Sequence, residues 1–262
     1  MLFMQLKLTD DHLPHDKILE SFKADFEKIK GKEFISLRRG DTGIGKTFEE
    51  IMNIPENNSK IADYDGVLEI KSKREFSQSM LTLTTKSPSQ PKKVNSLIRE
   101  KYGRPDATFK EVKVIHTTIK ATDFNSFDGK YGFKLEVDEA QHRIYILIKN
   151  LKNNQIEPKS IYYSFDDIKE IIETKLRYIA FIDAKSEKVD GKEKFTFKSA
   201  ILLYGLTLNK IIEGIKKGYV LYDIRLGAYG KGCKNEGKPH DHGSGFRVFK
   251  KDIPKLFGVT EI

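Results

Sequence analysis

The stretch DYDGVLEIK at residues 63–71 decides how the rest of the chain is read. Its second half alternates apolar and polar residues as a β-strand does, which puts Leu68 on one face and Glu69 and Lys71 on the other. A bend upstream would bring the carboxylate of Asp63 beside Glu69. Two carboxylates and a lysine at one strand end can hold Mg²⁺ and activate a water against a phosphate. An exposed strand face with no chemistry is the alternative interpretation.

The composition favours a polyanionic partner. The chain has 262 residues, with 47 Lys and Arg against 38 Asp and Glu, and its net charge is +9. A single cysteine, Cys233, excludes an internal disulfide and a Cys-rich zinc site. No apolar run approaches the ~18 residues of a membrane span, and the N-terminus lacks the pattern of a signal peptide. We therefore expect a soluble, cytoplasmic protein.

The hydrophobic periodicity predicts a mixed α/β chain. Helices are expected at 16–30, 48–52, 94–102, 165–176 and 207–217. Strands are expected at 33–37, 67–71, 80–88, 112–119, 131–137, 142–148, 177–184, 195–203, 222–226 and 245–250, with a charged turn at 185–194.

The segment 40–47 matches G-x4-G-K-T, the phosphate-binding loop of nucleotide hydrolases. Its context argues against that function, because the preceding strand is short and the following helix is cut by Pro55. A basic, glycine-rich loop facing a nucleic-acid backbone would use the same chemistry, with Lys46 as the cation. Glu49 follows in the short helix. It is either a further active-site acid or an acid favoured by the helix dipole.

Two further segments carry groups suited to DNA. Thr82, Thr84 and Lys86 share one face of a predicted strand, and the segment from Lys86 to Arg104, both included, contains six basic residues. Hydroxyls and cations grouped in this way suit phosphate contacts.

Near the C-terminus, Asp223 and Arg225 share a strand face ahead of a loop with six glycines. The loop leads to His240, Asp241 and His242, and Arg247 follows on a strand. A zinc site at the two histidines and a solvated loop are alternatives. A loop that carries Arg, Asp and His is also able to read base edges, since Arg pairs with guanine and Asp accepts from cytosine.

Four blocks in the same order resemble the MvaI/BcnI restriction endonucleases, on the MvaI side of that family. The blocks are GIGKTFE at 43–49, D-x5-E-I-K at 63–71, LTLTTKSP at 81–88, and the C-terminal run from Asp223-Ile224-Arg225 through His240-Asp241-His242-Gly243 to Phe246-Arg247. Together they span roughly residues 16–250.

The resemblance implies a MutH-like version of the PD-(D/E)xK nuclease fold, with two lobes around a cleft for double-stranded DNA. We expect a catalytic lobe at 1–110 and a recognition lobe at 111–262. It also implies a monomer that uses Mg²⁺ to cut short, pseudosymmetric CC…GG-type sites.

Carried over by position, Asp63, Glu69 and Lys71 form the metal-binding and catalytic trio, and Glu49 is the accessory acid. The residues that fall where the family reads bases are Asp223, Arg225, His240, His242 and Arg247. Two departures are a gap between Asp63 and Glu69 one residue longer than in MvaI, and Ala62 in place of the usual proline. They leave Asp65 as a rival of Asp63.

The sequence predicts a type II restriction endonuclease. A MutH-like strand-nicking repair endonuclease would share this active site. A DNA- or nucleotide-binding protein without nuclease activity is the alternative from another class.

Overall fold

The computed structural model describes residues 16–55 and 61–262, so the N-terminal segment in which we expected no signal peptide lies outside the described residues. The chain divides into two compact units. One contains the chain up to Gln78 together with Ile172–Leu206 and Leu256–Ile262, and the other contains Ser79–Ile171 and Thr207–Lys255. The chain thus changes units at Gln78 and returns twice, which differs from the single boundary expected at residue 110. The expected roles of the two lobes stay predictions.

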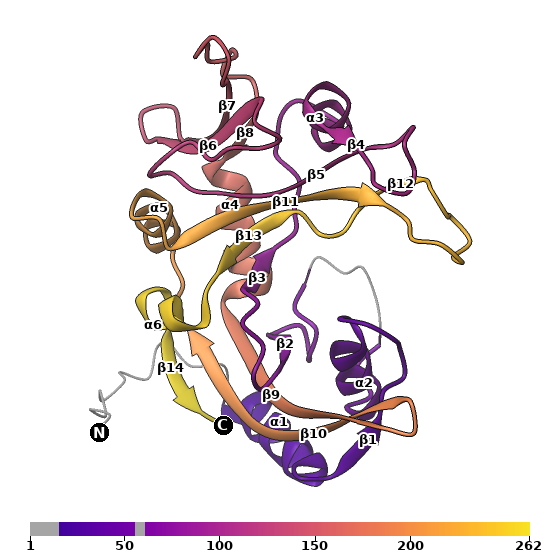
Figure 1. The fold of residues 1–262 in the computed structure, drawn as a ribbon. Helices are drawn as coiled ribbons and strands as arrows, with labels where there is room; N and C mark the ends of the chain where they lie inside the picture. Colours follow the sequence, from indigo (N-terminus) through magenta and orange to yellow (C-terminus); the bar gives the residue numbers. More distant parts are fainter. Residues whose placement is uncertain (1–15, 56–60) are drawn as a thin grey trace. The chain divides into compact units, whose positions relative to one another are not determined.

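The first unit is built on a five-stranded sheet in the order β1-β10-β9-β2, with β14 beside β10 (Figure 1). Its strands are β1 (Glu33–Ile35), β2 (Leu68–Arg74), β9 (Tyr178–Val189), β10 (Lys192–Tyr204) and β14 (Gly258–Glu261), and its helices are α1 (Asp16–Ile29), α2 (Gly43–Ile51) and a π-helix, η2 (Ile172–Leu176). β2 runs parallel to β9, and the other pairings are antiparallel.

One face of this sheet carries the core of the first unit. Phe22 and Phe26 of α1 and Phe48 of α2 pack there with Leu68 of β2 and Phe197 of β10. Their side chains are almost fully buried. At roughly 25 cal/mol per Å² of apolar surface, each contributes about 1.5–3 kcal/mol. The predicted inward position of Leu68 is confirmed, and Glu69 and Lys71 therefore lie on the opposite face of β2.

The charged turn predicted at 185–194 is wrong. β9 and β10 continue through most of it, and only Asp190 and Gly191 connect them, with φ of 51° and 74°. An Asp-Gly pair favours this two-residue turn because both of its positions need positive φ. Charged residues fill most of the outer strand ends, and Val189 is the one apolar residue between Lys185 and Lys194.

The second unit contains a six-stranded sheet in the order β3-β13-β11-β5-β4, with β12 beside β11, and a three-stranded sheet β6-β7-β8. Their bounds are β3 (Leu81–Thr84), β4 (Arg104–Pro105), β5 (Lys113–Ile119), β6 (Tyr131–Asp138), β7 (Arg143–Asn150), β8 (Tyr162–Ser164), β11 (Val220–Ala228), β12 (Pro239–Asp241) and β13 (Gly245–Val248). The remaining helices are α3 (Val94–Tyr102), α4 (Phe165–Ile171), α5 (Leu208–Lys216), η3 (Lys250–Asp252) and α6 (Ile253–Leu256).

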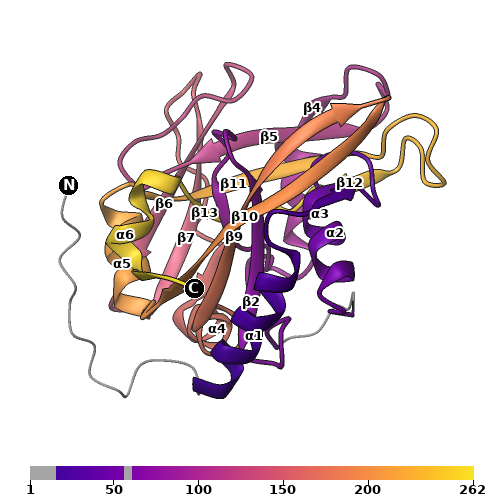
Figure 2. The same cartoon turned by 90° about the horizontal axis from the view of Figure 1, so that it is seen from below.

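The two faces of the six-stranded sheet differ sharply. Tyr222, Ile224 and Phe246 are buried on one face, and Tyr163 of β8 packs against Tyr222 and Phe246 there with ring centroids 5.7 and 5.0 Å away. The alternate residues of β11, Asp223 and Arg225, therefore lie on the other face. Figure 2 shows β5 and β11 side by side, the pairing that forms the centre of this polar face.

The predicted helix at 48–52 begins earlier than expected, at Gly43. The Gly45-Lys46-Thr47 triplet therefore lies inside a helix, and the amide of Lys46 donates to the carbonyl of Thr42 at 3.1 Å. The strand before it, β1, is an antiparallel edge strand. A phosphate-binding loop needs free amides after a buried strand, so this segment lacks its architecture.

Within the part of the chain that is described, no helix is long and apolar enough to cross a membrane.

Candidate active site and recognition face

A tight hairpin brings Asp63 to Glu69. Tyr64 and Leu68 pair across it, with their N–H groups donating to each other's carbonyls at 2.9 and 3.1 Å, and this pairing places Asp63 opposite Glu69. Asp65 and Gly66 form the turn, with φ of 49° and 69°. Asp65 is exposed at the tip, so the structure favours Asp63 over its rival as the partner of Glu69.

The hairpin is anchored on α1. The Tyr64 hydroxyl donates to Asp25 Oδ2 at 2.9 Å, and its ring meets Phe22 edge-on at 5.2 Å between centroids. The carboxylate of Asp63 is oriented in turn, because Oδ2 accepts from the backbone N–H of Ile70 at 3.0 Å. Oδ1 makes no hydrogen bond with another described residue.

Glu69 is buried, with 4% of its surface exposed. Its Oε1 accepts from Lys71 Nζ at 2.5 Å, whereas Oε2 is buried without a hydrogen bond from any described residue. The Nζ of Lys175 lies 4.0 Å from Oε2. Burial raises the pKa of Glu69 above its ordinary value; Lys71 opposes this shift and Asp63 adds to it.

This trio fits a divalent cation. Asp63 and Glu69 supply hard carboxylate oxygens, and one oxygen of each lacks a hydrogen bond within the described chain. The residues described include no cluster of three His, Cys, Asp or Glu side chains suited to a metal. Mg²⁺ needs no such cluster, since it commonly binds one or two carboxylates, water and a substrate phosphate.

Glu49 lies in the last turn of α2, where the sequence had placed it near a helix start. The helix dipole disfavours an acid at this end, so the interpretation of Glu49 as a dipole-stabilised acid is wrong. The interpretation as an accessory acid stays a prediction. On the same helix, Lys46 pairs with Glu50 at 3.2 Å.

The polar face of the six-stranded sheet holds several of the predicted base-reading residues. Arg225 is half-buried there and makes no hydrogen bond or ion pair through its side chain with another described residue. Its backbone N–H donates to Ser244 Oγ at 2.8 Å. Arg225 is thus held in place while its guanidinium keeps its donors available.

Arg247 is engaged by protein groups instead. Its guanidinium donates to Thr82 Oγ1 and to the carbonyl of Gly243, and its Nε lies 3.2 Å from Asp223 Oδ2. Asp223 Oδ1 also accepts from Thr118 at 2.7 Å. Burial lowers the pKa of Arg247, and Asp223 counteracts this. These contacts suit a residue that orients Asp223 beside Arg225.

Asp241 is fully engaged within the chain. Its Oδ1 accepts from the N–H groups of Gly243 and Ser244 at 3.0 and 2.7 Å and from Ser244 Oγ at 2.8 Å. Its Oδ2 accepts from Asn95 Nδ2 of α3 at 2.7 Å. The geometry therefore supports a role in fixing the turn after β12 more than the predicted contact with a base.

We expect Asp241→Ala to lower the free energy of unfolding by about 2 kcal/mol, since it removes four hydrogen bonds to one carboxylate. Urea denaturation measures this value. Asn95→Ala removes one of the four bonds and serves as the matched control, with an expected loss of about 0.5–1.5 kcal/mol. Equal losses in the two variants would contradict the role of Asp241 in the turn.

Three histidines gather at the edge of this face. His240 stacks on Tyr229 at 4.0 Å between centroids and meets His242 edge-on at 4.5 Å. His116 of β5 is the third, and the sequence analysis missed it. It pairs in register with Arg225, and a Cβ on Gly227 would lie 2.7 Å from His242 Nε2 and 3.0 Å from His116 Nε2.

Among the described residues, neither these three histidines nor any other set of three His, Cys, Asp or Glu side chains forms a group that could hold a metal ion. Burial and the neighbouring His242 lower the pKa of both His116 and His240, which favours their neutral forms. The only sequence signal for His116 was its polar position in an alternating strand.

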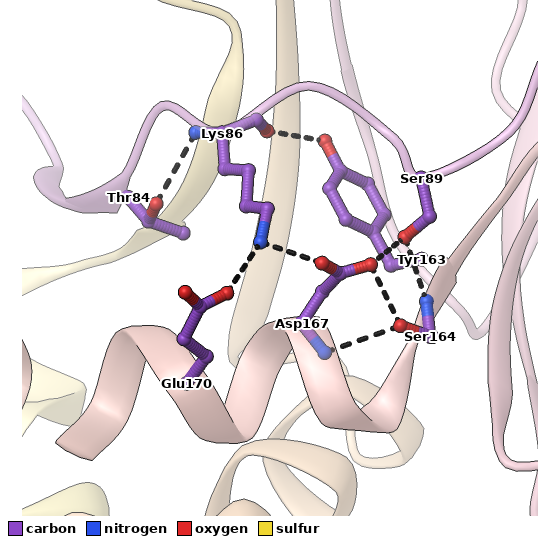
Figure 3. Close-up of polar contacts among 7 residues, drawn as sticks. All are labelled: Thr84, Lys86, Ser89, Tyr163, Ser164, Asp167 and Glu170. Carbon is purple, nitrogen blue, oxygen red and sulfur yellow. Dashed lines mark hydrogen bonds and ion pairs between the residues drawn. The ribbon is translucent and has the colours of Figure 1, made fainter. Parts of the chain in front are cut away.

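Lys86, a predicted phosphate contact, lies in a network of acids and hydroxyls (Figure 3). Its Nζ donates to Asp167 at 2.6 Å and to Glu170 at 3.2 Å. Asp167 also accepts a hydrogen bond from the hydroxyl of Ser89. A further one comes from the hydroxyl of Ser164, at 2.6 Å. Burial alone would raise the pKa of Asp167, but these hydrogen bonds hold it at about 2.

The same network fixes the loop after β3. Burial lowers the pKa of Lys86, and its bonds to the two acids outweigh this and raise it. Tyr163 donates from its hydroxyl to the carbonyl of Lys86 at 2.7 Å, and the N–H of Lys86 donates to Thr84 Oγ1 at 3.2 Å. Lys86 must therefore leave two carboxylates before it binds a phosphate.

Comparison with known proteins links this geometry to a family. The family model of the MvaI/BcnI restriction endonucleases matches residues 23–257. A solved complex of the restriction endonuclease MvaI with its cognate DNA substrate is 32% identical, covers 95% of this chain and 99% of that chain, and has a TM-score of 0.88. MvaI in the absence of DNA is 29% identical over the same shares, with a TM-score of 0.58. A search of curated protein sequences gave no match.

Proposed function

Since the chain belongs to the MvaI/BcnI restriction endonuclease family and is a type II site-specific deoxyribonuclease, we propose that it uses Mg²⁺ to hydrolyse phosphodiesters in double-stranded DNA at a CC…GG-type pseudosymmetric site. We further propose that it acts as a monomer and is located in the cytoplasm. The observation that carries the metal-dependent proposal is the pair Asp63 and Glu69, which the hairpin places opposite each other and each of which has one oxygen without a hydrogen bond from the described residues.

In this proposal Asp63 and Glu69 hold the metal. A bound Mg²⁺ would lower the pKa of a water and offset negative charge on the attacked phosphate. The hydrogen bond from Ile70 N–H and the anchoring of Tyr64 on α1 keep the Asp63 carboxylate oriented, so it needs little rearrangement on binding. Glu49 is the proposed accessory acid.

Lys71 has two candidate roles in the reaction. Its ammonium is partly exposed and lies against Glu69 Oε1. From there it can orient or help to deprotonate the attacking water, or it can stabilise charge that develops on the phosphate. Both roles place Lys71 at the reacting atoms.

The polar face of the six-stranded sheet is the proposed recognition surface. The guanidinium of Arg225 donates to no other described residue and suits guanine, which offers O6 and N7 in the major groove. His240 and His242 are further candidates, and Asp223 is held in place by Thr118 and Arg247. Thr82, Thr84, Lys46 and Lys86 are proposed to contact DNA through its backbone.

Arg225→Ala should weaken binding to the cognate site by about 1–3 kcal/mol and relax the choice at one base pair. Competition binding with duplexes altered at single positions measures this. Lys231→Ala, which removes an exposed lysine from the glycine-rich loop, is the control and should change all duplexes alike. Equal weakening by Arg225→Ala across all sequences would assign Arg225 to a phosphate instead.

Digestion of a sequenced phage DNA tests the whole proposal. With Mg²⁺ we expect discrete double-stranded fragments whose ends share one short site, and EDTA should stop the reaction. In a parallel digestion of circular plasmid DNA, nicked circles in place of linear molecules would favour the MutH-like repair alternative. Ends without a common sequence would refute site-specific cleavage.

A further inference from the structure

Lys175 lies beside the catalytic trio on an element that the sequence did not reveal. It belongs to the π-helix η2, which continues the chain directly from α4. Wide π-turns are rare and occur often at functional sites, because they shift a side chain out of the regular helical position. Here the shift accompanies a lysine whose ammonium faces the buried acid of β2.

The contact between Lys175 and Glu69 is incomplete. The 4.0 Å between Nζ and Oε2 is too long for a hydrogen bond, and Oε2 accepts none from the rest of the described chain. Lys71 occupies the other oxygen, Oε1. Glu69 thus has a different lysine at each oxygen, and one of the two, Lys175, donates no hydrogen bond to the other described residues.

The surroundings of Lys175 suit a phosphate ligand. Its side chain is 31% exposed, and Glu69 is the only acid with which it forms an ion pair within residues 16–55 and 61–262. An ammonium that is partly in water, close to a carboxylate but not bonded to it, can turn to an incoming anion at little cost. A lysine in a structural ion pair would instead bond its carboxylate directly.

From these observations we propose that Lys175 is a second phosphate-binding lysine of the catalytic centre, which contacts the DNA backbone next to Glu69. This inference rests on the proposed function, since it assigns a ligand to the same site. When DNA is absent, Lys175 faces Glu69 Oε2. When DNA is bound, its ammonium donates to a non-bridging phosphate oxygen and leaves Oε2 open.

The salt dependence of DNA binding separates this role from a structural one. A lysine that neutralises a phosphate releases a counterion, so its loss lowers the slope of log K against log salt concentration by about 0.9. Lys175→Met keeps the apolar stem and removes only the charge. Lys175→Arg keeps the charge, and Lys23→Met, at an exposed position of α1, is the matched control.

In the absence of divalent metal, we expect Lys175→Met to lower the slope of log K against log salt concentration by about 0.9, the value for one phosphate contact. Lys175→Arg should restore the slope. Single-turnover cleavage should fall by roughly 100-fold in Lys175→Met, the scale of losing one charge-stabilising donor. Lys23→Met should leave both measurements unchanged. Thermal melting confirms that each variant is folded, and Lys175→Gln replaces Lys175→Met if that variant does not fold.

An unchanged salt slope in Lys175→Met would overturn the inference, because it would show that Lys175 contacts no DNA phosphate. A cleavage rate equal to that of the unaltered enzyme would also overturn it. Neither result would affect the proposed function, which fails only if the unaltered chain shows no metal-dependent, site-specific cleavage.

Discussion

Glu69→Gln is expected to abolish cleavage and to raise the melting temperature of the metal-free protein. The amide cannot replace a carboxylate at the metal, and the loss should exceed the roughly 10- to 100-fold effect of altering an outer-shell partner. The same change relieves a buried charge whose Oε2 accepts no hydrogen bond from the described residues. We expect a rise of roughly 2–4 °C in EDTA, or about 1 kcal/mol for a chain of this size.

The sign of this effect follows from the raised pKa of Glu69. Between its ordinary pKa of 4.5 and the raised value, the folded protein keeps a proton that the unfolded chain has released. The free energy of unfolding therefore falls as the pH rises through this window, and it stays lowered above it. The difference in melting temperature between Glu69→Gln and the unaltered chain should grow from pH 4.5 upward.

Magnesium supplies the control for Glu69. A metal that binds the folded state stabilises it by mass action, so Mg²⁺ should raise the melting temperature of the unaltered chain. It should have little effect on Glu69→Gln. A variant that cleaves normally, or that responds to Mg²⁺ like the unaltered chain, would remove Glu69 from the metal site.

Lys71→Ala should lower cleavage by roughly 100- to 1,000-fold or more and leave specific DNA binding largely intact. In the proposed mechanism the Lys71 ammonium acts at the reacting atoms, where loss of one charge-stabilising donor has effects of this size. Single-turnover cleavage measures the rate, and binding in Ca²⁺ measures the affinity. Lys73→Ala, two residues further along the same face of β2, is the positional control for a lysine substitution in this strand.

The dependence of the rate on pH distinguishes the two roles of Lys71. If Lys71 deprotonates the water, Lys71→Ala should change the shape of the pH–rate profile. If it stabilises charge, the whole profile should move down with its shape preserved. A fully active Lys71→Ala variant would exclude Lys71 from the mechanism.

The alternating pattern of β2 was sufficient to predict which of its residues face the core. The sequence left Asp65 as a rival of Asp63. The structure places Asp65 at the tip of the turn, where Asp65 and Gly66 both have positive φ, as an Asp-Gly pair favours. The pattern did not predict that Glu69 is buried too. That depends on what covers the second face of the sheet, which sequence periodicity does not report.

The start of α2 was missed for a different reason. Gly43 and Gly45 are poor helix formers, so propensity delayed the expected start to Phe48. Buried contacts of Ile44 and Thr47 override that preference, and Thr47 Oγ1 also accepts from the N–H of Leu37 at 3.1 Å. The π-helix that carries Lys175 has no sequence signature.

For the candidate recognition residues, the sequence predicted the strand face of a side chain but not its hydrogen-bond partners. Asp223 and Arg225 were correctly expected on one face of a strand, because the period of two fixes that outcome, and Arg247 was expected on a later strand. The sequence did not predict that Arg247 is engaged by the hydroxyl of Thr82, 165 residues away, and by the carbonyl of Gly243, while the side chain of Arg225 makes no hydrogen bond with another described residue. The same is true of Asp241, whose partners include an asparagine 146 residues away.

β2 is the edge strand of its sheet, so among the described residues no strand pairs with one side of it along most of its length. Open strand edges invite pairing with other copies of a chain and hence aggregation. Asp63 blocks part of this edge, since its carboxylate occupies the N–H of Ile70. Asp63, which we propose binds the metal, thus also limits pairing at this strand edge. We expect a substitution of Asp63 to promote aggregation as well as to impair catalysis.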